Sequence, residues 1–114
     1  MFLLYKDLVT EIPNTLSPST NSQNINWDDG NIQTVDFQSA PTGVTFSFSN
    51  QKTGGTYTIE IIQGANLTNI TWPTSIKWES GVSLIPTSLD NAIDVVTMVY
   101  NGTNYYASFG KNFG

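Results

Sequence analysis

The adjacent carboxylates Asp28 and Asp29 are the first place where this sequence could support chemistry. Two carboxylates acting on one substrate are the arrangement that glycoside hydrolases use. In an extended segment, neighbouring side chains point to opposite faces, so these two would not share a substrate. The sequence favours a turn into Gly30, because Asp side chains bond nearby backbone amides in turns. A calcium site that includes Asn31 is the other alternative, although the spacing matches no defined calcium-binding loop.

Other residue types that catalysis commonly needs are missing. The chain has neither histidine, the most frequent general base, nor cysteine. Asp94 lies inside a predicted strand, where it either caps the strand edge or pairs with a lysine. We therefore expect no catalytic residues, no metal site, no cofactor and no enzymatic activity. A carboxylate pair within about 5–10 Å of each other in a cleft would reverse this expectation.

The three tryptophans, Trp27, Trp72 and Trp78, permit a binding function. An exposed indole can stack on a sugar ring, so Trp27 or Trp78 could form a glycan platform. The sequence favours the alternative that they are core or interface residues, since tryptophan buries a large area at low entropic cost. Trp78 ends an Ile-Lys-Trp alternation, which is typical of a packed strand face.

The composition is poor in charge. Charged residues make up 11% of the 114-residue chain and the net charge is -5, whereas soluble domains average about 25% charged residues. The four scattered lysines, with no arginine, argue against nucleic-acid binding. The apolar start of the chain is too short for a membrane helix or a signal peptide. A neutral polar surface suits contact with other protein, because burying it costs less than burying ions.

Short strands separated by turns account for most of the chain. The segment 44–49 alternates apolar and hydroxyl residues, and 56–62 places Tyr57, Ile59 and Ile61 on one face. Gly54 and Gly55 lie between these two segments, which predicts that they pair as a hairpin. Further strands are expected at 32–37, 70–72 and 76–78, and at most a short helical turn near 88–92.

The last predicted hairpin surrounds Asn101-Gly102, a strong turn signal. With either a two-residue loop or a four-residue loop, 101–104, the same residues share the inner face. The outer face then carries Val95, Val99 and Tyr106, which a strand facing water would not need. This hairpin is therefore either central in a two-layer fold, or its outer face is a subunit interface formed by Val95, Val99 and Tyr106.

These elements predict one all-β domain, an antiparallel β-sandwich of jelly-roll type. We assign residues 1–12 to an N-terminal arm, 13–24 to a linker and 25–114 to the sandwich domain. The arm is either an edge strand of its own domain or an attachment segment whose contact residues are Phe2, Leu3, Leu4, Tyr5 and Leu8.

Three runs of sequence, taken in order, resemble a β-rich surface module of tailed-bacteriophage virion proteins: capsid decoration proteins, head fibres and tail fibres. The resemblance covers roughly residues 24–113. The runs are GGTYTI with QG (54–59, 63–64), TWP with IKW and G (71–73, 76–78, 81), and IDVV with YNGTNYY and KNF (93–96, 100–106, 111–113). In tail fibres, such modules usually lie at the C-terminal end of longer chains. Here only a short region precedes the module, which favours a small accessory protein.

The resemblance implies a structural protein that is made in the bacterial host cytoplasm and placed on the virion surface. It implies a homo-oligomer, commonly a trimer, in contact with the major capsid protein or another virion protein, with no membrane partner. It supplies no catalytic residues. The alternative is the receptor-binding or carbohydrate-binding module of a tail fibre, in which a host-surface glycan would be the ligand.

Overall fold

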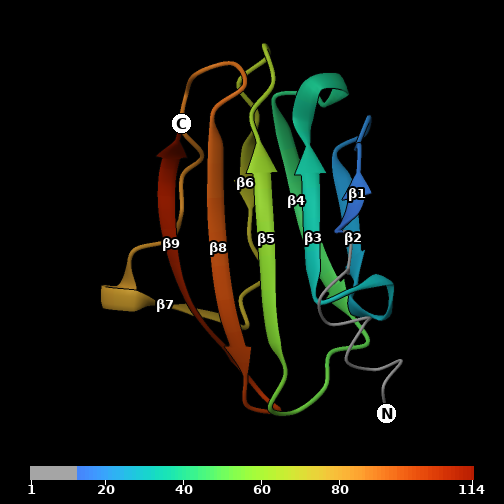
Figure 1. Ribbon diagram of the computed structural model, residues 1–114, viewed down its shortest axis with the longest axis vertical. Coiled ribbons are helices and arrows are strands. Elements are labelled where there is room, and N and C mark those ends of the chain that lie inside the picture. Colours follow the sequence, from blue (N-terminus) through green and yellow to red (C-terminus); the bar gives the residue numbers. More distant parts are fainter. Residues whose placement is uncertain (1–12) are drawn as a thin grey trace.

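The computed structural model describes residues 13–114 and arranges nine strands in two sheets (Figure 1). Sheet A forms the front layer in Figure 1, and sheet B lies behind it. Three single-turn 3-10 helices, η1 (Trp27–Asp29), η2 (Phe37–Ser39) and η3 (Glu79–Gly81), are the helical elements of this region. The strands of sheet A are, in spatial order, β1 (Asn14–Leu16), β3 (Ile32–Asp36), β5 (Thr56–Ile62), β8 (Ile93–Tyr100), β9 (Tyr105–Phe113) and β7 (Ile76–Trp78); those of sheet B are β2 (Ser22–Asn26), β4 (Gly43–Ser49) and β6 (Asn69–Thr71).

The first six strands alternate between the two sheets. Strands β1, β3 and β5 pair in parallel in sheet A, and β2, β4 and β6 pair in parallel in sheet B. Each A strand and the B strand that follows it form one rung, and three rungs stack as in a β-solenoid. Parallel pairing requires a crossover connection. In this fold, the connection between two parallel strands of one sheet is the intervening strand of the other sheet.

The predicted all-β class is confirmed, but the antiparallel arrangement is wrong for sheet B and for three pairings of sheet A, β1–β3, β3–β5 and β7–β9. The predicted hairpin of 44–49 with 56–62 is also wrong, since β4 and β5 belong to different sheets. Their alternating side chains do face the core, as the sequence indicates: Phe46 and Ile59 are buried. Alternation sets which face of a strand is buried but leaves its neighbour open.

The segment 13–24 is not a linker. It contains β1 and the start of β2, which pair with β3 and β4. Its Pro, Ser, Thr and Asn content is compatible with turns and also with an edge strand, and edge strands tolerate polar side chains on an exposed face. The β domain therefore includes residues that the composition assigned to a connection.

The last hairpin has the four-residue loop, with Tyr100 opposite Tyr105 and Met98 opposite Ala107. The Asn101 side chain closes this loop by accepting from the backbone N–H groups of Thr103 and Asn104, at 2.9 and 2.7 Å. The face predicted to be apolar points inward. Strand β5 pairs antiparallel with β8, so the hairpin extends the sheet formed by the rungs.

Both sheets bury their inner faces in one core. Sheet A contributes Ile59 and Val96, and sheet B contributes Val44 and Phe46, all at most 2% exposed. Aromatic rings connect the layers; the centroid of Phe48 lies 5.0 Å from that of Tyr105. Sheet A is wider than sheet B. The loop after η3 covers part of the difference, placing Leu84 in the core with 1% exposure.

Two buried polar side chains hold the long connection between β7 and β8. Gln63 accepts from the N–H groups of Gly64 and Thr68 and donates to the carbonyl of Thr87. Asp94, only 2% exposed, accepts from the backbone N–H and hydroxyl of Thr87, both at 2.7 Å, and from the N–H of Asn112 at 2.9 Å. Asp94 therefore anchors the connection before β8 and the end of β9, and among the described residues it pairs with no lysine.

Candidate functional site

Three loops meet at one end of the molecule, the lower end in Figure 1. They are 27–31 between β2 and β3, 50–55 between β4 and β5, and 101–104 between β8 and β9. The N–H of Gly54 donates to the carbonyl of Tyr100 at 2.7 Å, which ties the second loop to the third. Stacked rungs cross between the sheets at the same end, so the first two loops are neighbours although about 20 residues separate them in sequence. Loops on a rigid scaffold are a frequent location of binding residues.

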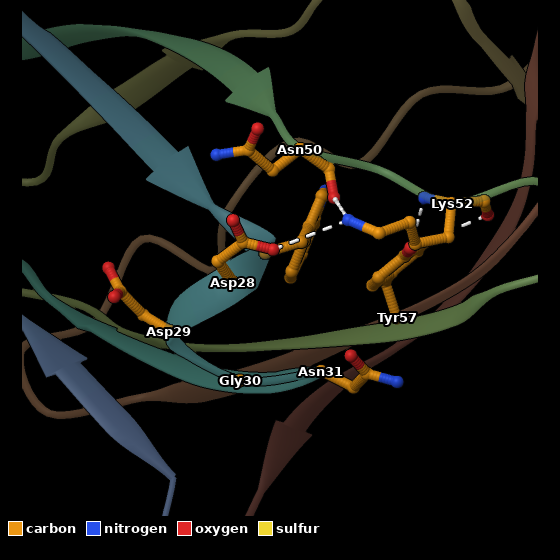
Figure 2. A pocket seen from close by; sticks show the side chains of 8 residues that line it. Asp28, Asp29, Gly30, Asn31, Asn50, Lys52 and Tyr57 are labelled. Atoms are coloured by element: carbon orange, nitrogen blue, oxygen red, sulfur yellow. Dashed lines mark hydrogen bonds and ion pairs between the residues drawn. The ribbon is translucent and has the colours of Figure 1, made fainter.

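An open depression of about 540 Å³ lies between the first two loops (Figure 2). We call it the loop-end pocket; it is lined by Trp27, Asp28, Asp29, Gly30, Asn31, Asn50, Lys52 and Tyr57. Its floor consists of the rings of Trp27 and Tyr57, stacked with centroids 4.5 Å apart. Both side chains are almost fully buried, with exposures of 3% and 2%. The floor is therefore part of the core and the rim is polar.

The rim carries one ion pair, in which the Lys52 Nζ lies 3.3 Å from Oδ1 of Asp28. The same ammonium donates to the carbonyl of Asn50 in its own loop at 3.1 Å, and Figure 2 shows both contacts. The Lys52 and Asp28 side chains are 72% and 59% exposed. Such an exposed pair adds little to folding stability, so its groups can exchange partners readily.

Local sequence explains why these loops hold their shape. Asn26 caps η1 by accepting from the N–H of Asp28 at 3.0 Å, and Gly30 ends η1 with a φ of 140°. Asn50 adopts a φ of 62°, a left-handed conformation that asparagine tolerates better than most residues. The Tyr57 hydroxyl accepts from the backbone N–H of Lys52 at 2.7 Å. The floor of the pocket thus fixes the backbone of its rim.

The turn predicted at Asp28 and Asp29 is confirmed, but its hydrogen bonds differ from those expected. Asn26, and not an aspartate, accepts the backbone amide. The helical turn also places both aspartates around one depression, whereas an extended segment would separate them. Sequence reasoning missed this arrangement because the neighbouring loop, which supplies Asn50 and Lys52, is identified only by the stacking of the rungs.

A buried phenol lies behind the floor of the pocket. The Trp27 Nε1–H donates to the hydroxyl of Tyr105 at 3.1 Å, and Tyr105 is 1% exposed. Burial raises the pKa of Tyr105 to about 12, although the hydrogen bond from Trp27 acts in the opposite direction. This phenol therefore stays protonated at neutral pH and has a structural role in the core.

The predicted interface residues gather on the outer face of sheet A. Val99 and Tyr106 are opposite each other in the β8–β9 pairing and are 49% and 53% exposed, and Val95 is half-buried on the same face. The ring of Phe113 covers Gly110, which is opposite Val95. The apolar residues of this face lie on either side of one polar cross-strand pair, Thr97 and Ser108, whose hydroxyls are 3.4 Å apart. Together we call them the outer strip: Ile93, Val95, Val99, Tyr106 and Phe113.

The two tryptophans considered as glycan platforms have different surroundings. Trp27 is 3% exposed and forms the pocket floor, so it presents no open ring face. Trp78 is partly buried and packs against Trp72 and Phe109, with centroids 5.1 and 5.9 Å away. It also lines a second depression of about 450 Å³ with Lys77, Glu79, Tyr106, Ala107 and Ser108. Trp78 is therefore the better placed of the two to meet a ligand.

The arm residues Phe2, Leu3, Leu4, Tyr5 and Leu8 lie outside the described residues. Within 13–114, no group of three or more His, Cys, Asp or Glu side chains could hold a metal ion. The same region contains no helix with the length and hydropathy that a membrane crossing requires.

No protein-family model, curated protein or solved structure matches this chain. The likeness to virion surface modules therefore has the three sequence runs as its sole support, and the function has to be argued from the chain's own surfaces. Two of these surfaces have features beyond what folding requires. They are the outer strip, which exposes large apolar groups, and the loop-end pocket, which gathers polar groups from two loops.

Proposed function

We propose that this chain is a non-enzymatic structural protein that assembles with further copies of itself through the outer strip. The observation that carries the proposal is the exposure of Val99 and Tyr106 side by side on an ordered sheet. Among the outward positions of β5 and β8, the one charged residue is Glu60, and the hydroxyl of Thr34 already donates to it at 3.1 Å. On the other side of the strip, β7 places Lys77 opposite Tyr106, so the charge lies at the edge of the strip. The apolar part of this face loses little hydration when a neighbour covers it.

In the full proposal, the two-layer body is a small capsid decoration or head-fibre protein of a bacteriophage, forming trimers on the particle surface. The major capsid protein or another virion protein is then its partner, and residues 1–12 provide the attachment arm. The three sequence runs that resemble virion surface modules support this placement, and the low charge of the chain agrees with it. This assignment requires two packed layers and an open outer face, and it does not depend on a jelly-roll topology.

Light scattering coupled to size-exclusion chromatography tests the assembly. We expect a mass of about three times the 12.5 kDa of one chain. Val99→Asp places a charge in the outer strip and is expected to yield monomers. Thr45→Asp is the matched control, because Thr45 is an exposed strand position on the opposite sheet. A monomeric native protein, or equal masses for the native chain and Val99→Asp, would refute assembly through this strip.

Binding to particles tests the virion placement separately. Purified protein is mixed with particles of the phage that encodes it, and co-sedimentation is measured for the full chain and for a chain lacking residues 1–12. We expect the full chain to sediment with the particles and the shortened chain to remain in solution. Equal binding by a folded shortened chain would remove the attachment role of the arm. No binding by either would remove the virion placement.

The second candidate function is receptor or carbohydrate binding, and the observation that favours it is the depression beside Trp78. Trp78 and Tyr106 line it together with the charged groups of Lys77 and Glu79. Binding to a glycan array that disappears in Trp78→Ala, with the fold retained, would support this candidate. An array without signal at high protein concentration would count against it.

A further inference from the structure

We propose that the loop-end pocket binds a neutral saccharide. The site is separate from the outer strip and from the depression beside Trp78, so the proposal depends on neither assembly nor a Trp78 platform. Its volume of about 540 Å³ falls within the range of roughly 300–1,000 Å³ that is typical of small-molecule sites. Its lining comes from two loops that the stacked rungs hold together, with the buried Trp27–Tyr57 pair as a fixed floor.

The charges of the rim exclude other classes of ligand. Asp28 and Asp29 are two carboxylates against the single ammonium of Lys52, which would repel phosphate or a carboxylate ligand. Among the described residues, no third His, Cys, Asp or Glu side chain joins the two aspartates, and the Lys52 ammonium, 3.3 Å from Asp28, competes with a cation. An apolar ligand would find little exposed carbon, because both rings of the floor are nearly covered.

A saccharide matches the hydrogen-bonding groups of the rim. Each sugar hydroxyl both donates and accepts, and the rim offers acceptors at Asp29, donors at Lys52 and both at the amide of Asn31. Among residues 13–114, the side chains of Asp29 and Asn31 make no hydrogen bond to another protein group. They are thus available to a ligand without breaking an internal contact. Lys52 can turn from Asp28 toward a hydroxyl at small cost, since their ion pair is exposed.

The pocket is also preorganised, which reduces the ordering cost of binding. The hydroxyl of Tyr57 holds the backbone of Lys52, and the amide nitrogen of Asn50 donates to Asn26 at 2.8 Å across the two loops. A ligand would therefore order only side chains. Because the site is open and polar, we expect weak binding, with a Kd on the order of 1 mM.

Amide chemical-shift mapping by NMR tests the proposal with four defined probes: methyl α-D-mannopyranoside, methyl α-D-glucopyranoside, methyl β-D-galactopyranoside and N-acetylglucosamine. We expect saturable shifts for at least one probe, confined to the amides of loops 27–31 and 50–55. A folded protein whose spectrum changes with none of the four would overturn the proposal. Shifts confined to the surroundings of Trp78 would also overturn it, while supporting the second candidate function.

Two variants connect the binding to the rim. The double variant Asp29→Asn with Asn31→Ala is expected to weaken binding by about tenfold or more. Asp90→Asn removes the same charge at the opposite end of the molecule, where Asp90 accepts from Gln38, and is expected to bind as the native chain does. Native-like binding by the double variant would contradict the assignment. The oligomer mass is measured on the same samples, so a failure of saccharide binding is distinguishable from a failure of assembly.

Discussion

The indole N–H of Trp27 donates to the phenol oxygen of Tyr105 at 3.1 Å, between residues that are 78 positions apart in the sequence. Both side chains are buried, so neither group can turn to water when its partner is missing. The bond joins the first loop of the rungs to the first residue of β9. It therefore links the parallel part of the fold to the antiparallel hairpin, directly behind the loop-end pocket.

Tyr105→Phe removes this acceptor and leaves a buried N–H unpaired. We expect a loss of about 1–3 kcal/mol in the free energy of unfolding, measured by urea denaturation. Tyr100→Phe is the matched control: its hydroxyl donates to the carbonyl of Gly102 at an exposed position outside the outer strip, and its loss is expected to change stability little. Equal stability of Tyr105→Phe and the native protein would show that the bond contributes nothing to folding.

The raised pKa of Tyr105 makes stability depend on pH in the alkaline range. An unfolded tyrosine loses its proton near pH 10, whereas Tyr105 in the folded chain keeps its proton until about pH 12. The unfolded state therefore binds fewer protons in that interval, and stability falls as the pH rises through it. We expect this decrease, on the order of 2 kcal/mol, to be smaller in Tyr105→Phe. Urea midpoints at a series of pH values measure it, and parallel curves for the two proteins would contradict it.

Asp94→Ala removes a buried acceptor that serves Thr87 and Asn112. Two backbone N–H groups then lose their partner, and the connection before β8 loses its attachment. We expect a loss of about 2–4 kcal/mol. We also expect faster amide hydrogen exchange in residues 85–92. Asp94→Asn retains one oxygen acceptor and is expected to fall between Asp94→Ala and the native chain. Native protection of residues 85–92 in Asp94→Ala would rule out this role.

Gly64→Ala tests the close approach of two loops. A Cβ at this position would lie within 3.0 Å of the backbone carbonyl of Phe37, so the backbone must move. We expect a loss of about 1–3 kcal/mol or more. Gly43→Ala is the control, since a Cβ there meets nothing within 4 Å. Alanine in that strand position should leave stability unchanged or raise it by about 0.5–1 kcal/mol. Similar stability of the two variants would show that residues 37 and 64 can separate freely.

The sequence alone determined which residues form strands over much of the chain and which faces they bury. In β4 and β5 the alternation of apolar and polar side chains is nearly complete, and the predicted inner faces are buried. In β8 and β9 both faces carry apolar residues, and the predicted inner residues Val96, Met98 and Tyr105 are buried. Asn101 and Gly102 likewise predicted the last turn. These features depend on local backbone geometry, in which neighbouring side chains of a strand point to opposite faces.

Only the tertiary structure decided which strands are neighbours. Alternation is the same for a strand in a parallel sheet and in an antiparallel one, so β4 and β5 could not be assigned to different sheets from their sequences. The loop-end pocket depends on that assignment, because Asp28 and Lys52 meet only where successive rungs cross between the sheets. Pairing is settled by the packing of all strands into one core, and the sequence of a single strand carries no record of it.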